Sequence, residues 1–207
     1  MIENPTSGKG AQTRAKLLKA AADELVESEG QLEVAAVARR AGTSIGLTYR
    51  YFQNKGALAA AVVEDFFDRQ DEAVLMAQIE AETWRHRERR RIELMIAFHY
   101  AEPLARVALG GLAREPEVAA VMVDRQSRQA AIAAAMLARG QDLGMIDQHI
   151  DPSIVGPMLL GAIREALRVA LAAGDALGAG DLTREVLTFV DAATRVRPSP
   201  APAAPRG

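Results

Sequence analysis

The chain has 207 residues, of which 49% are hydrophobic and 4% aromatic, and its formal net charge is -2. It has no cysteine, which excludes a disulfide framework and a thiolate metal site. No apolar run reaches the roughly 18 residues of a membrane span, and residues 1–12 lack the apolar core of a signal peptide, so we expect a cytoplasmic protein. Ala and Leu dominate the apolar residues, which favours packed helices, and we predict an all-α fold.

The first part of the chain reads as a mobile arm followed by four helices. We expect residues 1–11 to be mobile. Apolar residues recur at helical spacing from Thr13 to Val26, and Gly30 is placed to end this helix. A short helix at 34–41, a tight turn at 42–44 and a third helix at about 45–52 follow. A long fourth helix begins near Lys55 and runs to about residue 70.

The rest of the chain repeats the helical pattern, at about 70–82, 85–109, 116–139, 152–173 and 182–196, with Gly and Pro between the segments. Asp151 followed by Pro152 is typical of a helix start, and Asp181 is a candidate cap for the last helix. Residues 197–207 alternate Pro with small residues, which predicts an extended, disordered tail.

Two short helices joined at Gly42 are typical of a helix-turn-helix. Gly42 allows the left-handed turn, and Ser44 is a natural N-cap for the third helix. A small helical hairpin in a core has the same spacing. DNA binding is favoured because side chains that reach phosphates or base edges cluster here, namely Thr43, Ser44, Tyr49, Arg50, Tyr51 and Lys55.

The stretch from Ala38 to Leu58, ARRAGTSIGLTYRYFQNKGAL, resembles the signature of the TetR family of bacterial regulators, and the resemblance covers about residues 12–60. It implies a DNA-binding domain at 12–58 and an effector-binding and dimerisation domain at 70–196. It also implies roles for single residues. Tyr49 and Lys55 would contact phosphates, Ser44 and Gly46 would lie at the start of the recognition helix, and Ile45, Leu47, Arg50 and Tyr51 would read bases.

Several positions depart from the family pattern. Thr43 replaces a common Val, Ile45 replaces a Lys, and Glu33, Ala35 and Ala36 replace Thr, Arg and Asp. The order Leu47-Thr48 is reversed, so we expect Thr48 to face the core and Leu47 the DNA. These changes leave the operator sequence open and raise the alternative of a small-molecule-binding protein with a degenerate DNA-binding head.

The resemblance further implies a homodimer and an effector cavity. The expected dimer interface, a four-helix bundle of the last two helices, contains Ile154, Met158, Ile163, Leu182, Val186, Phe189 and Val190. A monomer core is the alternative. The expected pocket contains Trp84, Met95, Phe98, His99, Tyr100, Met122 and Met158, with Met136 nearby, and takes a small hydrophobic effector anchored by His99 or Tyr100. Ordinary core packing is again the alternative.

The remaining motifs indicate no chemistry. The three histidines are scattered, and we expect no metal, no cofactor and no enzyme activity. Residues 85–91, rich in arginine, read as a solvated helix face, with contact to the DNA backbone or to an acidic effector as the weaker alternative. The predicted function is a repressor released from a palindromic operator by its effector. An activator is not excluded, and a helical enzyme using His99 or Glu165 is the least favoured reading.

Overall fold

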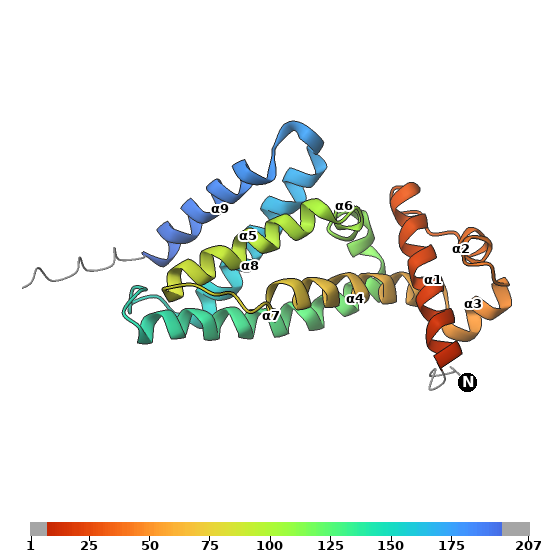
Figure 1. Ribbon diagram of the computed structural model, residues 1–207, viewed down its shortest axis with the longest axis horizontal. Helices are drawn as coiled ribbons and strands as arrows, with labels where there is room; N and C mark the ends of the chain where they lie inside the picture. The colour runs from red at the N-terminus through yellow and green to blue at the C-terminus, as the bar shows by residue number, and fades with distance from the viewer. Residues whose placement is uncertain (1–7, 196–207) are drawn as a thin grey trace, which may run out of the picture. The chain divides into compact units, whose positions relative to one another are not determined.

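The computed structural model describes residues 8–195, apart from the side chains of residues 113, 114 and 175. This range is helical and contains no strand, which confirms the all-α prediction (Figure 1). The expected tail at 197–207 and residues 1–7 of the expected arm lie outside the described residues. Residues 8–11, also expected in the arm, instead form the first turns of a helix.

The described helices follow one another along the chain with short connections. They are α1 (Gly8–Glu27), α2 (Val34–Ala41), α3 (Ile45–Tyr51), α4 (Lys55–Val74), α5 (Trp84–Ala101), α6 (Leu104–Ala108), α7 (Pro116–Asp142), α8 (Pro152–Ala172) and α9 (Ala179–Thr194). Two short 3-10 turns, η1 (Gly111–Arg114) and η2 (Gly174–Ala176), precede α7 and α9.

Three predicted boundaries are wrong. α4 ends at Val74 and residues 75–83 are not helical, although a helix was expected at 70–82. The helix expected at 85–109 is broken into α5 and α6, because Pro103 has no N–H to donate and instead starts α6 as its N-cap. Asp181 lies in the first turn of α9, whose N-cap is Gly178.

The chain divides into two compact units, with boundaries after residues 77, 96 and 125. The first unit comprises residues 8–77 and 97–125, and the second comprises residues 78–96 and 126–195. In the first unit α1 packs on α2, α4 and α6. Its most deeply buried side chains include Leu17, Leu25, Val37, Leu58 and Phe66.

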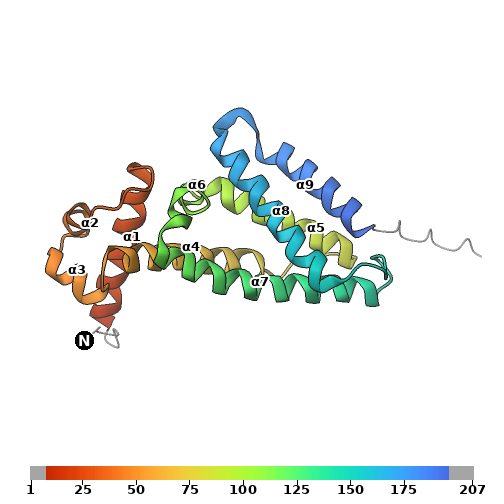
Figure 2. The same cartoon turned by 180° about the vertical axis from the view of Figure 1, so that it is seen from behind.

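The second unit is built on close helix contacts. α8 and α9 lie side by side (Figure 2) and bury Ile163, Leu167, Leu182 and Val186. α8 crosses α7 at Gly156, where a Cβ atom would lie 2.8 Å from the backbone nitrogen of Ala134. A glycine is therefore needed for these two backbones to approach so closely.

Candidate nucleic-acid interface and effector site

The turn between α2 and α3 has the geometry that the sequence predicts. Gly42 has φ 66° and ψ 37°, in the left-handed region, and caps α2 by donating to the carbonyl of Arg39. The Ser44 Oγ accepts a hydrogen bond from the backbone N–H of Leu47 at 3.1 Å, which confirms Ser44 as the N-cap of α3. Ala38, at 2% exposure, is buried where a larger side chain would separate the helices.

α3 turns one face inward and the other outward. Thr48 is 1% exposed, and its hydroxyl donates to the carbonyl of Ser44 at 3.3 Å, so the expectation that Thr48 faces the core is confirmed. Leu47 is half-buried, in keeping with its place beside the outer face. Of the other predicted DNA contacts on and before α3, Ser44, Ile45, Gly46, Tyr49 and Arg50 are exposed, and Thr43 and Tyr51 are half-buried.

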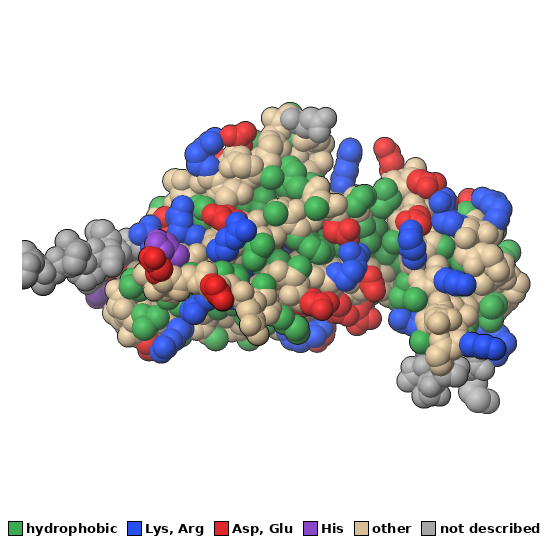
Figure 3. Space-filling model, viewed as in Figure 1, with side chains coloured by type: hydrophobic (Ala, Val, Ile, Leu, Met, Phe, Trp, Pro, Cys, Tyr) green, Lys and Arg blue, Asp and Glu red, His purple; other side chains and the backbone are tan. Residues whose placement is uncertain are grey.

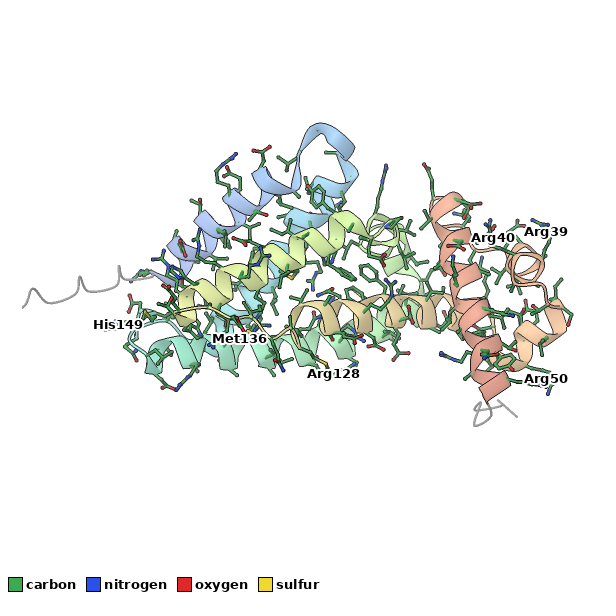
Figure 4. All side chains as sticks on the ribbon, in the orientation of Figure 1. Arg39, Arg40, Arg50, Arg128, Met136 and His149 are labelled. Carbon is green, nitrogen blue, oxygen red and sulfur yellow. The ribbon has the colours of Figure 1, made fainter. Side chains whose placement is uncertain are left out.

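The outer face of α3 combines apolar and cationic side chains. Ile45 is 46% exposed and Tyr49 is 48% exposed, both large fractions for apolar or aromatic side chains. Figure 4 shows Arg50 on α3. A short helix with such a face has the size and polarity to enter a major groove.

The connection from α3 to α4 fixes the start of α4. Phe52 is buried, and the guanidinium carbon of Arg14 in α1 lies 5.5 Å from the centre of its ring. The Asn54 side chain caps α4 by accepting from the N–H of Ala57 at 2.7 Å. Lys55, the first residue of α4, is exposed. A cationic side chain at a helix N-terminus is well suited to a phosphate.

Acidic and basic side chains are mixed on the head formed by α1–α3 (Figure 3). Arg40 in α2 is held by two acids of α1, at 2.6 Å from Glu27 and 3.3 Å from Glu24. Its hydrogen bond holds the pKa of the Glu27 carboxyl below its usual value. Arg39, labelled with Arg40 in Figure 4, is exposed in the last turn of α2. Arg39 was not among the predicted site residues, although a basic residue just before the turn was the available signal.

Four predicted pocket residues lie in the first unit, and the structure brings two of them together on α5. His99 is 3% exposed, and its ring lies 5.8 Å from the ring of Phe66 and 5.7 Å from that of Phe98. Phe98 itself lies 5.5 Å from Phe66 of α4. Of the other two, Met122 is buried in α7 and Tyr100 is half-buried.

A polar residue beside this aromatic cluster was missed. Gln70 lies one turn after Phe66 on the buried face of α4 and is only 5% exposed. Its Oε1 has no hydrogen-bond partner among the described residues. A buried acceptor without a partner is costly unless a donor reaches it. The signal in the sequence was a polar residue in the apolar stripe of α4.

The remaining predicted pocket residues lie in the second unit. Trp84 packs against the buried cluster of Leu137, Ile146 and Leu159. Met95 and Met136 are half-buried on α5 and α7, and Figure 4 marks Met136. Met158 is 64% exposed on α8 and does not belong to this buried cluster, so its place in a pocket stays a prediction.

The predicted interface residues divide into a buried and an exposed group. Ile163, Leu182 and Val186 are at most 5% exposed within the chain itself, where α8 packs on α9. Val190 is half-buried against the Leu137 cluster. Ile154, Met158 and Phe189 are 58%, 64% and 47% exposed, and Val169, which was not predicted, is 52% exposed.

The arginine-rich start of α5 is engaged in ion pairs within the chain. Arg85 and Arg89 both contact Asp191 Oδ2 of α9 at 2.9 Å. Arg91 pairs with Glu88 at 3.2 Å. These contacts favour the interpretation of the run as a helix face over a surface for DNA or an acidic effector.

Residues 8–195 contain neither a metal-binding cluster nor a membrane-spanning helix. No group of three or more His, Asp or Glu side chains could hold a metal ion in this range. No described helix is both long and apolar enough to cross a bilayer.

Comparisons with known proteins agree on one family. Residues 17–62 match the family model described as bacterial regulatory proteins, tetR family. These residues contain α2, α3 and the whole of the signature at 38–58 on which the sequence resemblance rests. No curated protein sequence matches the chain.

Solved structures resemble the chain over most of its length. A TetR-family transcriptional regulator from Pectobacterium atrosepticum is 22% identical, with a TM-score of 0.72 over 94% of this chain and 100% of its own. SmeT, the repressor of a Stenotrophomonas maltophilia multidrug efflux pump, is 22% identical, with a TM-score of 0.71 over 91% and 97%. The fatty acid degradation regulator FadR from Bacillus halodurans is 18% identical, with a TM-score of 0.70 over 86% and 94%. Residues 17–62 therefore match the N-terminal domain of bacterial regulatory proteins of the tetR family, and the fold of the chain is similar to that of solved TetR-family regulators.

Proposed function

We propose that this protein is a transcriptional repressor that leaves a palindromic operator when it binds a small hydrophobic effector. The observation that carries the proposal is the exposed face of α3, which a left-handed turn at Gly42 and a capped start at Ser44 hold out from the head. Such a short, rigid and exposed helix is what a major groove accepts.

The side chains of the head divide into two roles in this proposal. Tyr49 and Lys55 bind backbone phosphates, with Thr43, Ser44 and Gly46 close to the backbone at the start of α3. Ile45, Leu47, Arg50 and Tyr51 meet the base edges. Arg50 is the residue able to make a bidentate contact to guanine, and Ile45 suits a thymine methyl group. The base-facing positions include apolar side chains, of which Ile45 is 46% exposed, and these make no polar contact to a base. Base recognition in this proposal therefore depends mainly on Arg50.

The exposed apolar side chains of α8 and α9 support a homodimer. Ile154, Met158 and Val169 on α8 and Phe189 on α9 are each 47% exposed or more. Exposed large apolar residues on adjacent helices are typical of an interface. A two-fold axis through this surface gives two heads, whose half-sites on DNA lie about 34–36 Å apart.

The effector site in this proposal includes the aromatic cluster of buried Phe66, half-buried Phe98 and buried His99 in the first unit, together with Gln70. Aromatic walls favour an apolar body, and the partnerless Oε1 of Gln70 favours a ligand that carries a hydrogen-bond donor. The names of two similar structures, a repressor of a multidrug efflux pump and a regulator of fatty acid degradation, are in keeping with a hydrophobic effector class.

The test is a binding titration of the full chain on DNA from upstream of its own gene, at several salt concentrations. We expect the logarithm of the affinity to fall linearly with the logarithm of salt, by about 0.9 for each phosphate contacted. Arg50→Ala should reduce the preference for specific over random DNA, whereas Tyr49→Phe should weaken both alike. Affinity that is absent or insensitive to salt would contradict the proposal.

A second candidate is a small-molecule-binding protein whose head no longer reads DNA. The exposed Glu33 at the start of α2 and the apolar Ile45 on α3 favour it, because a carboxylate repels phosphates and isoleucine makes no polar contact. Selection from random DNA distinguishes the two candidates. Enrichment of a palindrome supports the regulator, and ligand binding without any enriched sequence supports the second candidate.

A further inference from the structure

In the first unit, the first turn of α7 reaches the first turn of α4. A Cβ atom built on Gly56 would overlap the carboxylate carbon and both carboxylate oxygens of Glu117. The carboxylate therefore lies directly against the Cα of Gly56, one residue after Lys55. Any side chain at position 56 would have to displace it.

The carboxylate is well placed by elementary electrostatics. Glu117 is in the first turn of α7, and Gly56 is in the first turn of α4. These helices have 27 and 20 residues, and the N-terminus of each carries partial positive charge from its unpaired N–H groups. One negative charge thus lies close to two helix starts, where it is electrostatically favourable.

We propose that Glu117 is an internal competitor of DNA at the start of α4. This inference rests on the proposed DNA-binding function, in which Lys55 and the N-terminus of α4 receive a backbone phosphate. A carboxylate already at that helix end reduces the positive potential that attracts the phosphate. Because the Glu117 carboxylate lies against Gly56, the residue after Lys55, the position of the first turn of α7 also influences the affinity for DNA in this proposal.

Two independent substitutions take the negative charge away from the start of α4. Glu117→Gln removes the charge and keeps the shape. Gly56→Ala keeps the charge but pushes the carboxylate away, and the shift is an easy one because it involves only the end of a flexible side chain. Glu115→Gln is the matched control, since Glu115 is also exposed and lies two residues before Glu117.

The experiment measures the affinity of the full-length protein for one operator fragment, in the wild type, the three variants and the Gly56→Ala/Glu117→Gln double variant. We expect Glu117→Gln to raise the affinity about three- to tenfold, the scale of one nearby charge that is partly screened. Gly56→Ala should raise it by less, and should add nothing in the Glu117→Gln background. Glu115→Gln should change it by less than about twofold.

The outcomes separate this inference from the function on which it rests. If the wild type binds DNA with the expected salt dependence but Glu117→Gln behaves like Glu115→Gln, the competitor role is overturned and the regulator proposal stands. An independent, additive effect of Gly56→Ala in the double variant overturns it too. If the wild type binds no DNA, both proposals fall. Thermal melting of each variant checks that affinity differences come from folded protein.

Discussion

Replacing Arg125 by methionine should destabilise the first unit, because this arginine joins α7 to α4 from a buried position. Its side chain is 4% exposed, contacts Asp71 at 2.5 Å and also pairs with Asp68. Its guanidinium carbon lies 5.6 Å from the ring centre of Phe67. Methionine keeps much of the buried volume while removing the charge and the hydrogen bonds.

The expected cost is moderate. Breaking a buried ion pair typically costs about 3–5 kcal/mol, because a charge is left without a partner. Here Asp68 is 66% exposed and Asp71 is 22% exposed, so water can solvate both carboxylates. The Nε of Arg125 also has no partner among the described residues, and its removal relieves a desolvation cost of about 1 kcal/mol or more. We therefore expect a loss of about 2 kcal/mol, roughly thirtyfold in the unfolding equilibrium and about 4–8 °C in Tm.

The assay is urea unfolding followed by far-ultraviolet circular dichroism, at one fixed protein concentration because association contributes to stability. Asp71→Asn and Asp68→Asn provide an internal ranking. Asp71→Asn should cost about 1 kcal/mol, and Asp68→Asn should cost less, because exposed ion pairs contribute little. The reasoning would be refuted if Arg125→Met unfolded with the free energy of the wild type. It would also be refuted if Asp68→Asn lowered that free energy as much as Asp71→Asn.

Three further predictions concern single contacts. Ser44→Ala removes the acceptor of the Leu47 N–H and should cost about 1 kcal/mol of stability in urea unfolding. Gly156→Ala should cost about 1–3 kcal/mol in the same assay, because the added methyl group meets the backbone of α7. Asp147 accepts hydrogen bonds from the backbone and side chain of His149, which lower its pKa to about 2. A lowered folded pKa means that its stabilising effect is present above the unfolded value of about 3.9 and is lost as pH falls from there to about 2. The Asp147 carboxyl should therefore titrate near pH 2 by NMR.

Each of these three has a control. Ser44→Thr should retain most of the stability that Ser44→Ala loses, since threonine also caps helices. Gly161→Ala lies in the same helix with nothing within 4 Å of the added Cβ, so it should be neutral or stabilising, and an equal loss at both glycines would contradict the close approach at Gly156. Asp147→Asn should remove the corresponding part of the acid sensitivity, and titration of Asp147 near its ordinary value would rule out the effect.

Local signals predicted the head well. Gly42, Ser44 and Asp151 act within a few residues of their own position, so the turn and two helix starts could be derived from sequence. The break at Pro103 was less clear, because a proline both ends helices and occurs within their first turn. α8 illustrates the ambiguity, since it continues through Pro157.

Residues whose partners are distant in sequence were not predictable. α8 has apolar residues on most of its surface, and only its packing against α9 shows that Ile163 is buried while Met158 is exposed. Arg125 did not stand out, because its partners on α4 are more than 50 residues away. Gln70 could be placed on the apolar stripe of α4 from its spacing, but its burial without a partner follows only from the packing around it.

α4 is an unbroken helix from Lys55 to Val74, so a displacement of one end tilts the whole helix and moves the other end. Lys55 and Gln70 are separated by about 22 Å along the axis, at 1.5 Å per residue. A tilt of only about 5° about the Gln70 end would move Lys55 by about 2 Å, which is the size of the helix shifts that carry many allosteric transitions. A small movement of Gln70 toward a ligand could therefore be enough to break the phosphate contact that we propose for Lys55.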